Sequence, residues 1–246
     1  MKIGHIVWNS TSFASLGVFV TGKDVENAAE PDVTVYQIAG RNGDFAVSNN
    51  RWKNIMITYP AFIPASSATN MQTLRNALKR EWEYGRLEDT YDSTHYRLAR
   101  PVGELQFDIV RPNGAEFEFV FDCYPQRFLK SGDTQLTFTS NSCTTNNPTD
   151  FDAKPQIFIG SFTSGTEIEV YNDATGETTV MTATTSYADT VVIDCEKQDI
   201  YDESTWDNKN NIFEVAEFPV LTGGNNVITI SGTATTAYVV PRWWEL

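Results

Sequence analysis

The stretch FPVLTGGNNVITISGTATTAYVVPRWWEL, residues 218–246, decides how the second half of the chain folds. Within residues 227–231 the apolar Ile228 and Ile230 alternate with polar or smaller neighbours, which is the period of two expected of a β-strand. The preceding turn, residues 222–226, consists mainly of glycine and asparagine, which tolerate positive φ. A last strand at 238–240 then completes a closing β-hairpin.

Two large aromatic residues, Trp243 and Trp244, follow Pro241, which ends or edges the last strand. A floppy tail would rarely carry two tryptophans, because exposed aromatic area is costly in water. We therefore expect the chain end to pack onto a β-sandwich. No residue of the stretch indicates catalysis.

The length, charge and cysteine content of the chain limit the kinds of function that it can have. The chain has 246 residues, enough for one large or two modest domains, and a net charge of −14 that disfavours binding to nucleic-acid phosphates. Cys123, Cys143 and Cys195 are odd in number and widely spaced, so neither a disulfide framework nor a zinc site is indicated. The amino terminus lacks a signal-peptide pattern, and no apolar run is long enough to span a membrane. We expect a soluble protein made in the cytoplasm.

The first half of the chain predicts an α+β domain with one helix. Residues 69–84 place Met71, Leu74, Leu78 and Trp82 at helical spacing, with Gly85 as the expected end of the helix. This apolar stripe is typical of a helix packed on a sheet, not of a cofactor site. The remaining predicted strands lie at residues 3–8, 16–20, 33–38, 53–59, 95–99, 105–110 and 115–121.

Turns connect these strands. Asn42-Gly43 is a strong hairpin signal, since both turn positions need positive φ. Pro60 and Pro64 are expected to mark a further turn. Residues 111–114 join two strands, the second of which puts Phe117, Phe119 and Phe121 on one face and Glu116, Glu118 and Val120 on the other.

The second half predicts strands without helices. Runs rich in threonine, valine and isoleucine alternate with short glycine, asparagine or aspartate turns, and residues 197–211 read as a long acidic loop. Pro125 and the polar residues after it favour a domain exit near Lys130. The predicted fold is therefore mainly β with one helix: an α+β domain over 1–130, followed by a β-sandwich over 131–246.

The sequence contains few residues that could form a catalytic, metal or cofactor site. The acids around Trp206 are numerous, and paired carboxylates occur in glycosidases, but an acidic loop is far more often only solvated. His5 and His95 lack flanking cysteines or paired acids, and no nucleophile, metal or phosphate-binding motif occurs. The sequence predicts no catalytic residue, no metal site and no cofactor. The acids concerned are Asp194, Glu196, Asp199, Asp202, Glu203 and Asp207.

Three separated stretches resemble distal tail proteins of long-tailed bacteriophages. They are the Gly-Arg-Asn-Gly-Asp-Phe turn at 40–45, the Pro-Gln-Arg-Phe exit at 125–128, and the ending at 218–246. The resemblance implies a ring-forming amino-terminal domain, a sandwich outside the ring, and a structural role without catalysis. It implies a homohexamer in the virion tail tip that contacts the tail tube protein, a tail-tip or tail-associated protein and a receptor-binding protein.

The same resemblance suggests candidate interface residues. On residues alone, Arg41, Asn42, Gly43 and Asp44 form a surface hairpin; the resemblance places this turn near a subunit contact, where arginine can pair bidentately with a carboxylate. Arg127 of the exit segment is a further candidate. DNA is expected to pass through the acidic ring without specific binding. The alternative function is a carbohydrate-binding β-sandwich module, supported by the aromatic content.

Overall fold

The computed structural model describes residues 4–23, 28–80, 82–110 and 114–246. The chain divides into two compact units, one comprising 1–127 with Leu246 and the other comprising 128–245. The predicted turn at 111–114 lies outside the described residues except for Gly114. Each unit has its own hydrophobic core.

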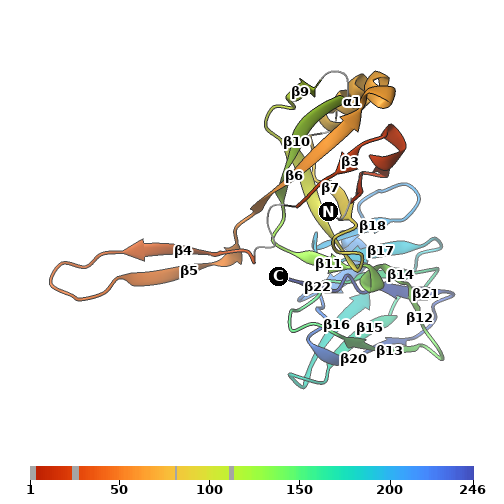
Figure 1. The fold of residues 1–246 in the computed structure, drawn as a ribbon. Coiled ribbons are helices and arrows are strands. Elements are labelled where there is room, and N and C mark those ends of the chain that lie inside the picture. Colours follow the sequence, from red (N-terminus) through yellow and green to blue (C-terminus); the bar gives the residue numbers. More distant parts are fainter. Residues whose placement is uncertain (1–3, 24–27, 81, 111–113) are drawn as a thin grey trace. The chain divides into compact units, whose positions relative to one another are not determined.

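Unit 1 is built on an antiparallel sheet in the order β2-β1-β7-β8-β10-β6-β3, with β9 also paired to β10 (Figure 1). Short 3₁₀ turns, η1 (Ala14–Leu16) and η2 (Ala65–Asn70), connect parts of it. The strands are β1 (Ile6–Trp8), β2 (Thr11–Ser12), β3 (Phe19–Val20), β6 (Ile55–Pro64), β7 (Gly85–Asp89), β8 (His95–Val102), β9 (Phe107–Val110) and β10 (Gly114–Cys123).

One face of this sheet forms the core of unit 1. Phe117, Phe119 and Phe121 of β10 are buried as predicted, while Glu116 and Glu118 on the opposite face are exposed. The helix α1 (Met71–Arg80) covers the apolar face with Leu74 and Leu78, which belong to the same core. Burial of such a leucine contributes about 1.5–3 kcal/mol. The predicted mainly β fold with one helix is confirmed within the described part of the chain.

Two predictions about this unit are wrong. Residues 82–84 are not helical: Trp82 is 74% exposed, and Gly85 begins β7 instead of ending the helix. Pro60 lies inside β6 rather than in a turn. The Pro60 carbonyl accepts a hydrogen bond from the Thr21 amide at 2.8 Å, so the Pro60 nitrogen also faces the chain that continues from β3. Because proline has no N–H to donate there, the β3–β6 ladder ends at the Val20–Ala61 pair.

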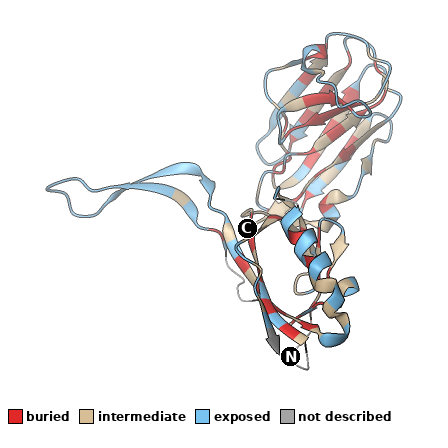
Figure 2. Ribbon diagram, turned by 90° about the horizontal axis from the view of Figure 1, so that it is seen from above, coloured by how far each residue is buried: buried red, intermediate tan, exposed pale blue. Residues whose placement is uncertain are grey.

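A long hairpin interrupts unit 1. Among the strands that the structure describes, β4 (Pro31–Tyr36) and β5 (Phe45–Trp52) pair only with each other, and they extend away from the sheet (Figures 1 and 2). Every residue from 33 to 54 is exposed. This hairpin carries the predicted Asn42-Gly43 turn.

Unit 2 is a β-sandwich of two five-stranded sheets, ordered β12-β21-β14-β17-β18 and β13-β20-β15-β16-β19. A short segment, β11 (Arg127–Leu129) and η3 (Lys130–Asp133), leads into it, β22 (Trp244–Glu245) closes it, and η4 (Asn210–Ile212) precedes β19. The sheet strands are β12 (Leu136–Thr137), β13 (Ser142–Asn147), β14 (Gln156–Ile159), β15 (Glu167–Asn172), β16 (Glu177–Ala183), β17 (Val191–Asp194), β18 (Asp199–Asp202), β19 (Phe213–Val215), β20 (Gly224–Ser231) and β21 (Ala237–Val240).

The two sheets share one core. Ile157 of β14 and Ile193 of β17 belong to the same buried cluster as Ile168 of β15 and Ile228 of β20. The predicted alternation in this last strand is confirmed, since Ile228 and Ile230 are buried while Thr229 and Ser231 are not. The predicted long loop at 197–211 is wrong in part, because this polar segment contains β18 and η4.

The beginning and the end of unit 2 are hydrogen-bonded to each other. The Leu129 amide donates to the Trp243 carbonyl at 2.9 Å, and the Arg242 amide donates to the Gly132 carbonyl at 2.9 Å. A Cβ on Gly132 would lie 2.4 Å from the Trp243 nitrogen, so only glycine allows this approach. Trp243 is buried, and Trp244 stacks on Phe151 at 4.5 Å, as expected of a packed chain end.

Candidate functional site

The β4–β5 hairpin carries apolar side chains on both faces, and no helix or strand of the described residues covers them. Val35 pairs with Ala46 on one face, and Tyr36 pairs with Phe45 on the other. Tyr36 is 54% exposed and Phe45 is 47% exposed. The other exposed large apolar side chains of the arm are Val33, Val35, Ile38, Val47 and Trp52. Such a concentration of exposed apolar groups marks an interaction surface.

Few contacts support the hairpin from within. Near its base, Arg51 Nε lies 2.6 Å from Asp32 Oδ2, although the arginine side chain is 72% exposed. Thr34 and Asn49 exchange a side-chain hydrogen bond across the strands. Exposed ion pairs contribute little, and an isolated two-stranded hairpin is marginally stable in water. The arm therefore has little intramolecular support beyond the pairing of its own two strands.

The predicted interface residues Arg41, Asn42, Gly43 and Asp44 lie together in the loop at the tip of this hairpin, and all four are exposed. Gly40 and Gly43 have φ of 81° and 84°, whereas Asn42 does not have positive φ. The hairpin prediction is thus confirmed, but the connection is the loop 37–44 and not a two-residue turn. Neither Arg41 nor Asp44 forms an ion pair with any residue that the structure describes.

Arg127, the remaining candidate, lies in a polar cluster at the turn between β7 and β8. Arg127 Nη1 is 3.5 Å from Asp92 Oδ2, and Asp92 also accepts hydrogen bonds from Thr94 and from His95 Nδ1. Burial raises the pKa of Asp92, but the hydrogen bonds from His95 and Thr94 outweigh burial and lower it to about 2. The structure does not bring Arg127 into the hairpin loop.

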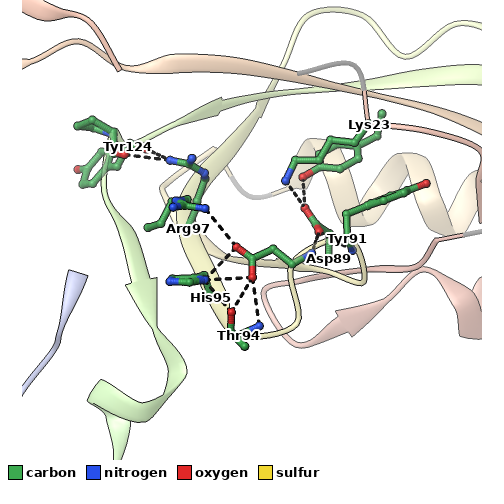
Figure 3. Close-up of polar contacts among 11 residues, drawn as sticks. Lys23, Asp89, Tyr91, Thr94, His95, Arg97 and Tyr124 are labelled. Carbon is green, nitrogen blue, oxygen red and sulfur yellow. Dashed lines mark hydrogen bonds and ion pairs between the residues drawn. The ribbon is translucent and has the colours of Figure 1, made fainter. Parts of the chain in front are cut away.

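The rest of the cluster fixes backbone segments to one another (Figure 3). Asp89 accepts the Tyr59 hydroxyl at 2.6 Å, pairs with Lys23 at 3.1 Å and caps the amides of Tyr91 and Asp92. Arg97 donates to the carbonyls of Tyr124 and Pro125. These groups are occupied in holding the β7–β8 turn and the exit segment, which makes the cluster structural.

The acids of unit 2 are likewise structural acceptors. Asp202 accepts hydrogen bonds from the Ser204 hydroxyl, the Thr205 amide and the Tyr187 hydroxyl, and these bonds lower its pKa. Asp194 is 1% exposed and lies 3.0 Å from Arg242. Both carboxylates are saturated, so the geometry favours loop fixation over catalysis.

Trp206 is exposed in a way the sequence did not predict. It is 68% exposed, has φ of 63° and stacks one ring face on Tyr201 at 5.1 Å. Its other ring face is therefore open to solvent. The tight loop between β18 and η4, not the acidic composition, produces this platform.

A second surface was missed by sequence reasoning: the uncovered face of β3, β6, β10 and β9. In one cross-strand row Phe19 lies opposite Phe62, Phe62 opposite Glu116, and Glu116 opposite Asp108. Together with Thr21, Pro60, Glu104, Gln106 and Glu118 these residues line a broad open groove. The available signal was the alternation in β6, where Phe62 falls on the side opposite the buried Ala61 and Ile63.

The three cysteine side chains are closed to solvent. Cys123, Cys143 and Cys195 are buried free thiols, and burial raises their pKa, for Cys123 to about 12. Within the described residues, no group of His, Cys, Asp and Glu side chains is arranged to hold a metal. The described helices include none with the length and apolar character needed to cross a membrane.

Two comparisons with known proteins bear on these features. Residues 148–243 match the family described as siphovirus-type tail component, C-terminal domain. The whole chain superimposes on the whole of the SPP1 Dit protein (gp 19.1), described as a paradigm of the hub adsorption apparatus in phages that infect Gram-positive bacteria, with a TM-score of 0.72 and 11% identity. No curated protein matches the chain.

The structural comparison and the family match concern different properties of the chain. At 11% identity the likeness to the solved structure concerns the fold, whereas the family match concerns the carboxy-terminal domain. Together they confirm the predicted resemblance to distal tail proteins and the mainly β fold.

Proposed function

We propose that six copies of this chain, whose residues 148–243 match a siphovirus-type tail component domain and whose fold is similar to that of a distal tail hub protein, form a closed ring at the phage tail tip. The ring joins the tail tube protein on one side to a tail-tip or tail-associated protein on the other. A separate receptor-binding protein recognises the host. The protein is made in the bacterial cytoplasm and acts by shape and self-association, without catalysis.

The observation that carries this proposal is the exposed β4–β5 hairpin. A free chain that presents seven exposed large apolar side chains on one arm gains free energy when a neighbouring molecule covers them. A closed ring needs a heterologous contact, in which one patch of each subunit meets a different patch of the next. An arm that extends from its own sheet is suited to such a contact (Figure 2).

The tip residues fit this role. Arg41, Asn42, Gly43 and Asp44 are exposed, and we propose that they lie at the subunit interface. Arg127 is 34% exposed on its side chain, so it can face a neighbour while it pairs with Asp92. Its first role is to hold the exit segment.

The mass of the assembly tests the ring. Light scattering of the purified chain, alone and with the tail tube protein, is expected to give about six times 27.6 kDa. The double substitution Tyr36→Ser with Phe45→Ser is expected to abolish this species. The matched control is Tyr171→Ser with Val180→Ser, which changes two residues of unit 2 that are each 40% exposed. A particle that survives the hairpin substitutions, or a chain that stays monomeric under both conditions, contradicts the proposal.

The net charge supports passage of DNA without retention. A surface with a charge of −14 repels phosphates, so DNA crosses the ring without specific binding. Filter binding of double-stranded DNA at about 50 mM salt is expected to show no complex; a salt-sensitive complex contradicts this point.

Trp206 favours the second candidate function, carbohydrate binding. Tyr201 stacks on one face of the Trp206 ring, and the opposite, solvent-exposed face is an aromatic platform on which a sugar ring can stack. Glycan-array binding by the full chain tests it. Loss of binding in Trp206→Ala but not in Trp82→Ala, which removes another exposed indole, would establish the platform. Absence of binding in the unaltered chain removes this candidate.

A further inference from the structure

The groove of unit 1 is lined by four exposed carboxylates, those of Glu104, Asp108, Glu116 and Glu118. Glu116 lies directly opposite Asp108 in the β9–β10 ladder, and Glu118 follows on the same face of β10. Like charges directly opposite each other destabilise a sheet. No ion pair to a described residue compensates Glu116, Glu118 or Asp108. A cationic group from outside unit 1 would remove this cost.

The same groove also presents apolar area. Phe19 is 37% exposed, and Phe62 and Val120 are partly exposed on the same face. Phe19 and Phe62 lie in the same cross-strand row as Glu116. A simple cation would leave these rings in water, and a nucleic acid would be repelled by the carboxylates. The groove therefore fits a protein segment that combines arginine or lysine with apolar side chains.

The tip of the β4–β5 hairpin has this composition. Arg41 is exposed and forms no ion pair among the described residues, and Tyr36, Ile38 and Phe45 flank it with exposed apolar area. A guanidinium can bind carboxylates bidentately and can stack over an aromatic ring such as that of Phe19. Gly40 and Gly43 have open space around them, so the loop is accessible to a partner.

The hairpin does not reach the groove of its own chain. Residues 33–54 are all exposed, and β4 and β5 make strand pairs only with each other. The arm leads away from the sheet that carries the groove (Figures 1 and 2). The matching occupant is therefore the hairpin of a second copy.

We infer that the groove formed by β3, β6, β10 and β9 receives the hairpin tip of the neighbouring copy, with Arg41 between Glu116 and Glu118. This inference rests on the proposed ring and names the surface that receives the arm. Arm and groove are different patches, so each subunit gives one and accepts one. Asp44 has the wrong charge for the groove, which fixes the orientation of the loop: Arg41 enters and Asp44 stays at the rim.

A charge exchange tests the pairing. Arg41→Glu alone and Glu116→Lys alone are each expected to weaken assembly about tenfold or more, as for a desolvated interfacial charge pair. The double variant Arg41→Glu with Glu116→Lys is expected to recover most of the loss. Asp44→Lys is expected to leave assembly intact or strengthen it. The measurement is the dissociation constant from sedimentation velocity over a dilution series.

The outcomes separate the two proposals. If Arg41→Glu weakens the ring but Glu116→Lys does not, or if the double variant is no better than either single one, the arm docks elsewhere and the groove assignment is overturned while the ring stands. If the unaltered chain never assembles, alone or with the tail tube protein, both proposals fail.

Disulfide trapping provides an independent measurement, because the native thiols are buried. Ala39→Cys with Gln106→Cys, treated with a mild copper-phenanthroline oxidant, is expected to give a ladder of covalent oligomers on a non-reducing gel. Ala39→Cys with Thr178→Cys is the control, since Thr178 is exposed in unit 2. Equal ladders from both pairs, or none from the first, contradict the inference.

Discussion

The hairpins β4–β5 and β15–β16 have similar apolar patterns and opposite surroundings. In β15–β16, Ile168 pairs with Met181 and both are 0% exposed. In β4–β5, Val35 pairs with Ala46 and is 53% exposed. Alternating apolar residues fix the strand, but the surface that covers them can belong to the same chain or to another. The β15–β16 hairpin contributes buried residues to the core of unit 2, whereas the large apolar side chains of the β4–β5 hairpin are exposed.

The largest expected difference concerns apolar truncation. Ile168→Ala is expected to lower the free energy of unfolding of the sandwich by about 2–5 kcal/mol, because it leaves a cavity in a packed core. Val35→Ala in the unassembled chain is expected to stay within about 0.5 kcal/mol, since no packed neighbour is lost. Urea unfolding of both variants measures this. A large effect of Val35→Ala would show that the arm is packed in the free subunit.

The next difference concerns acid titration. The folded pKa of Asp92, about 2, lies below the unfolded value near 3.9, so its charge stabilises the fold above pH about 4 and this contribution is lost as the pH falls toward 2. Asp92→Asn is expected to cost about 1–2 kcal/mol at neutral pH, after allowance for solvent screening, and to flatten the acid limb of unfolding stability.

The β4–β5 hairpin offers the control for this titration. The hydrogen bond from Arg51 lowers the pKa of Asp32, but the pair is on the exposed arm. Asp32→Asn is therefore expected to leave the acid limb of global unfolding unchanged. Equal profiles for Asp92→Asn and Asp32→Asn would contradict the contrast. Both are read from urea midpoints between about pH 2 and pH 7.

A pair of glycines gives a smaller effect. Gly176, in the β15–β16 turn, and Gly43, at the tip of β4–β5, have φ of 71° and 84°, and at both positions an added Cβ would have no atom within 4 Å. Gly176→Ala is expected to cost about 1 kcal/mol of unfolding free energy from left-handed strain. Gly43→Ala introduces the same backbone strain, but the hairpin loop can relieve it by opening locally. The free energy of global unfolding is therefore expected to be unchanged. Thermal denaturation distinguishes the two; a shared loss in melting temperature would refute the uncoupled arm.

The smallest expected effect on stability comes from a thiol probe. Ser48→Cys on β5 is expected to leave unfolding unchanged and to react with Ellman's reagent at the rate of a free thiol. The native thiols, buried and with raised pKa, are expected to react only after unfolding. In the assembled ring the Ser48→Cys thiol is expected to react more slowly; an unchanged rate would place this part of the arm outside the interface.

Much of the fold follows from local patterns. Phe117 to Phe121 and Ile228 to Ile230 alternate as their strands require, because a buried face leaves one register. The prediction for Pro60 is wrong because a strand tolerates a proline where its pairing with a neighbouring strand stops. That point is set by Thr21, which follows β3 and is far from Pro60 in the sequence. The prediction for Trp82 is wrong because the helical spacing of apolar residues continues beyond Leu78, the last residue of α1 that is buried against the sheet, and Trp82 is exposed.

The site was predictable only in part. The turn 40–45 identified the hairpin through its glycines, and the resemblance pointed to a contact. The groove was not identified, since Asp108 and Glu116 become neighbours only through strand pairing and Phe19 joins them through β3. Residues that meet across strands from distant parts of the chain leave no local signal. The sequence predicts no catalytic role for the acids near Trp206, and the structure adds that Asp202 accepts hydrogen bonds from Ser204 and Thr205 of its own loop.

The paired amides and carbonyls of Leu129 with Trp243 and of Gly132 with Arg242 place the entry and the exit of the sandwich next to each other. A module tethered by adjacent ends can be exchanged for another of different size without redirecting the polypeptide that holds it. New termini opened at an exposed turn such as 173–176, with the old ends joined by a short linker, should give a circularly permuted sandwich that still folds. The joint, rather than the domain it carries, is the part that engineering must leave intact.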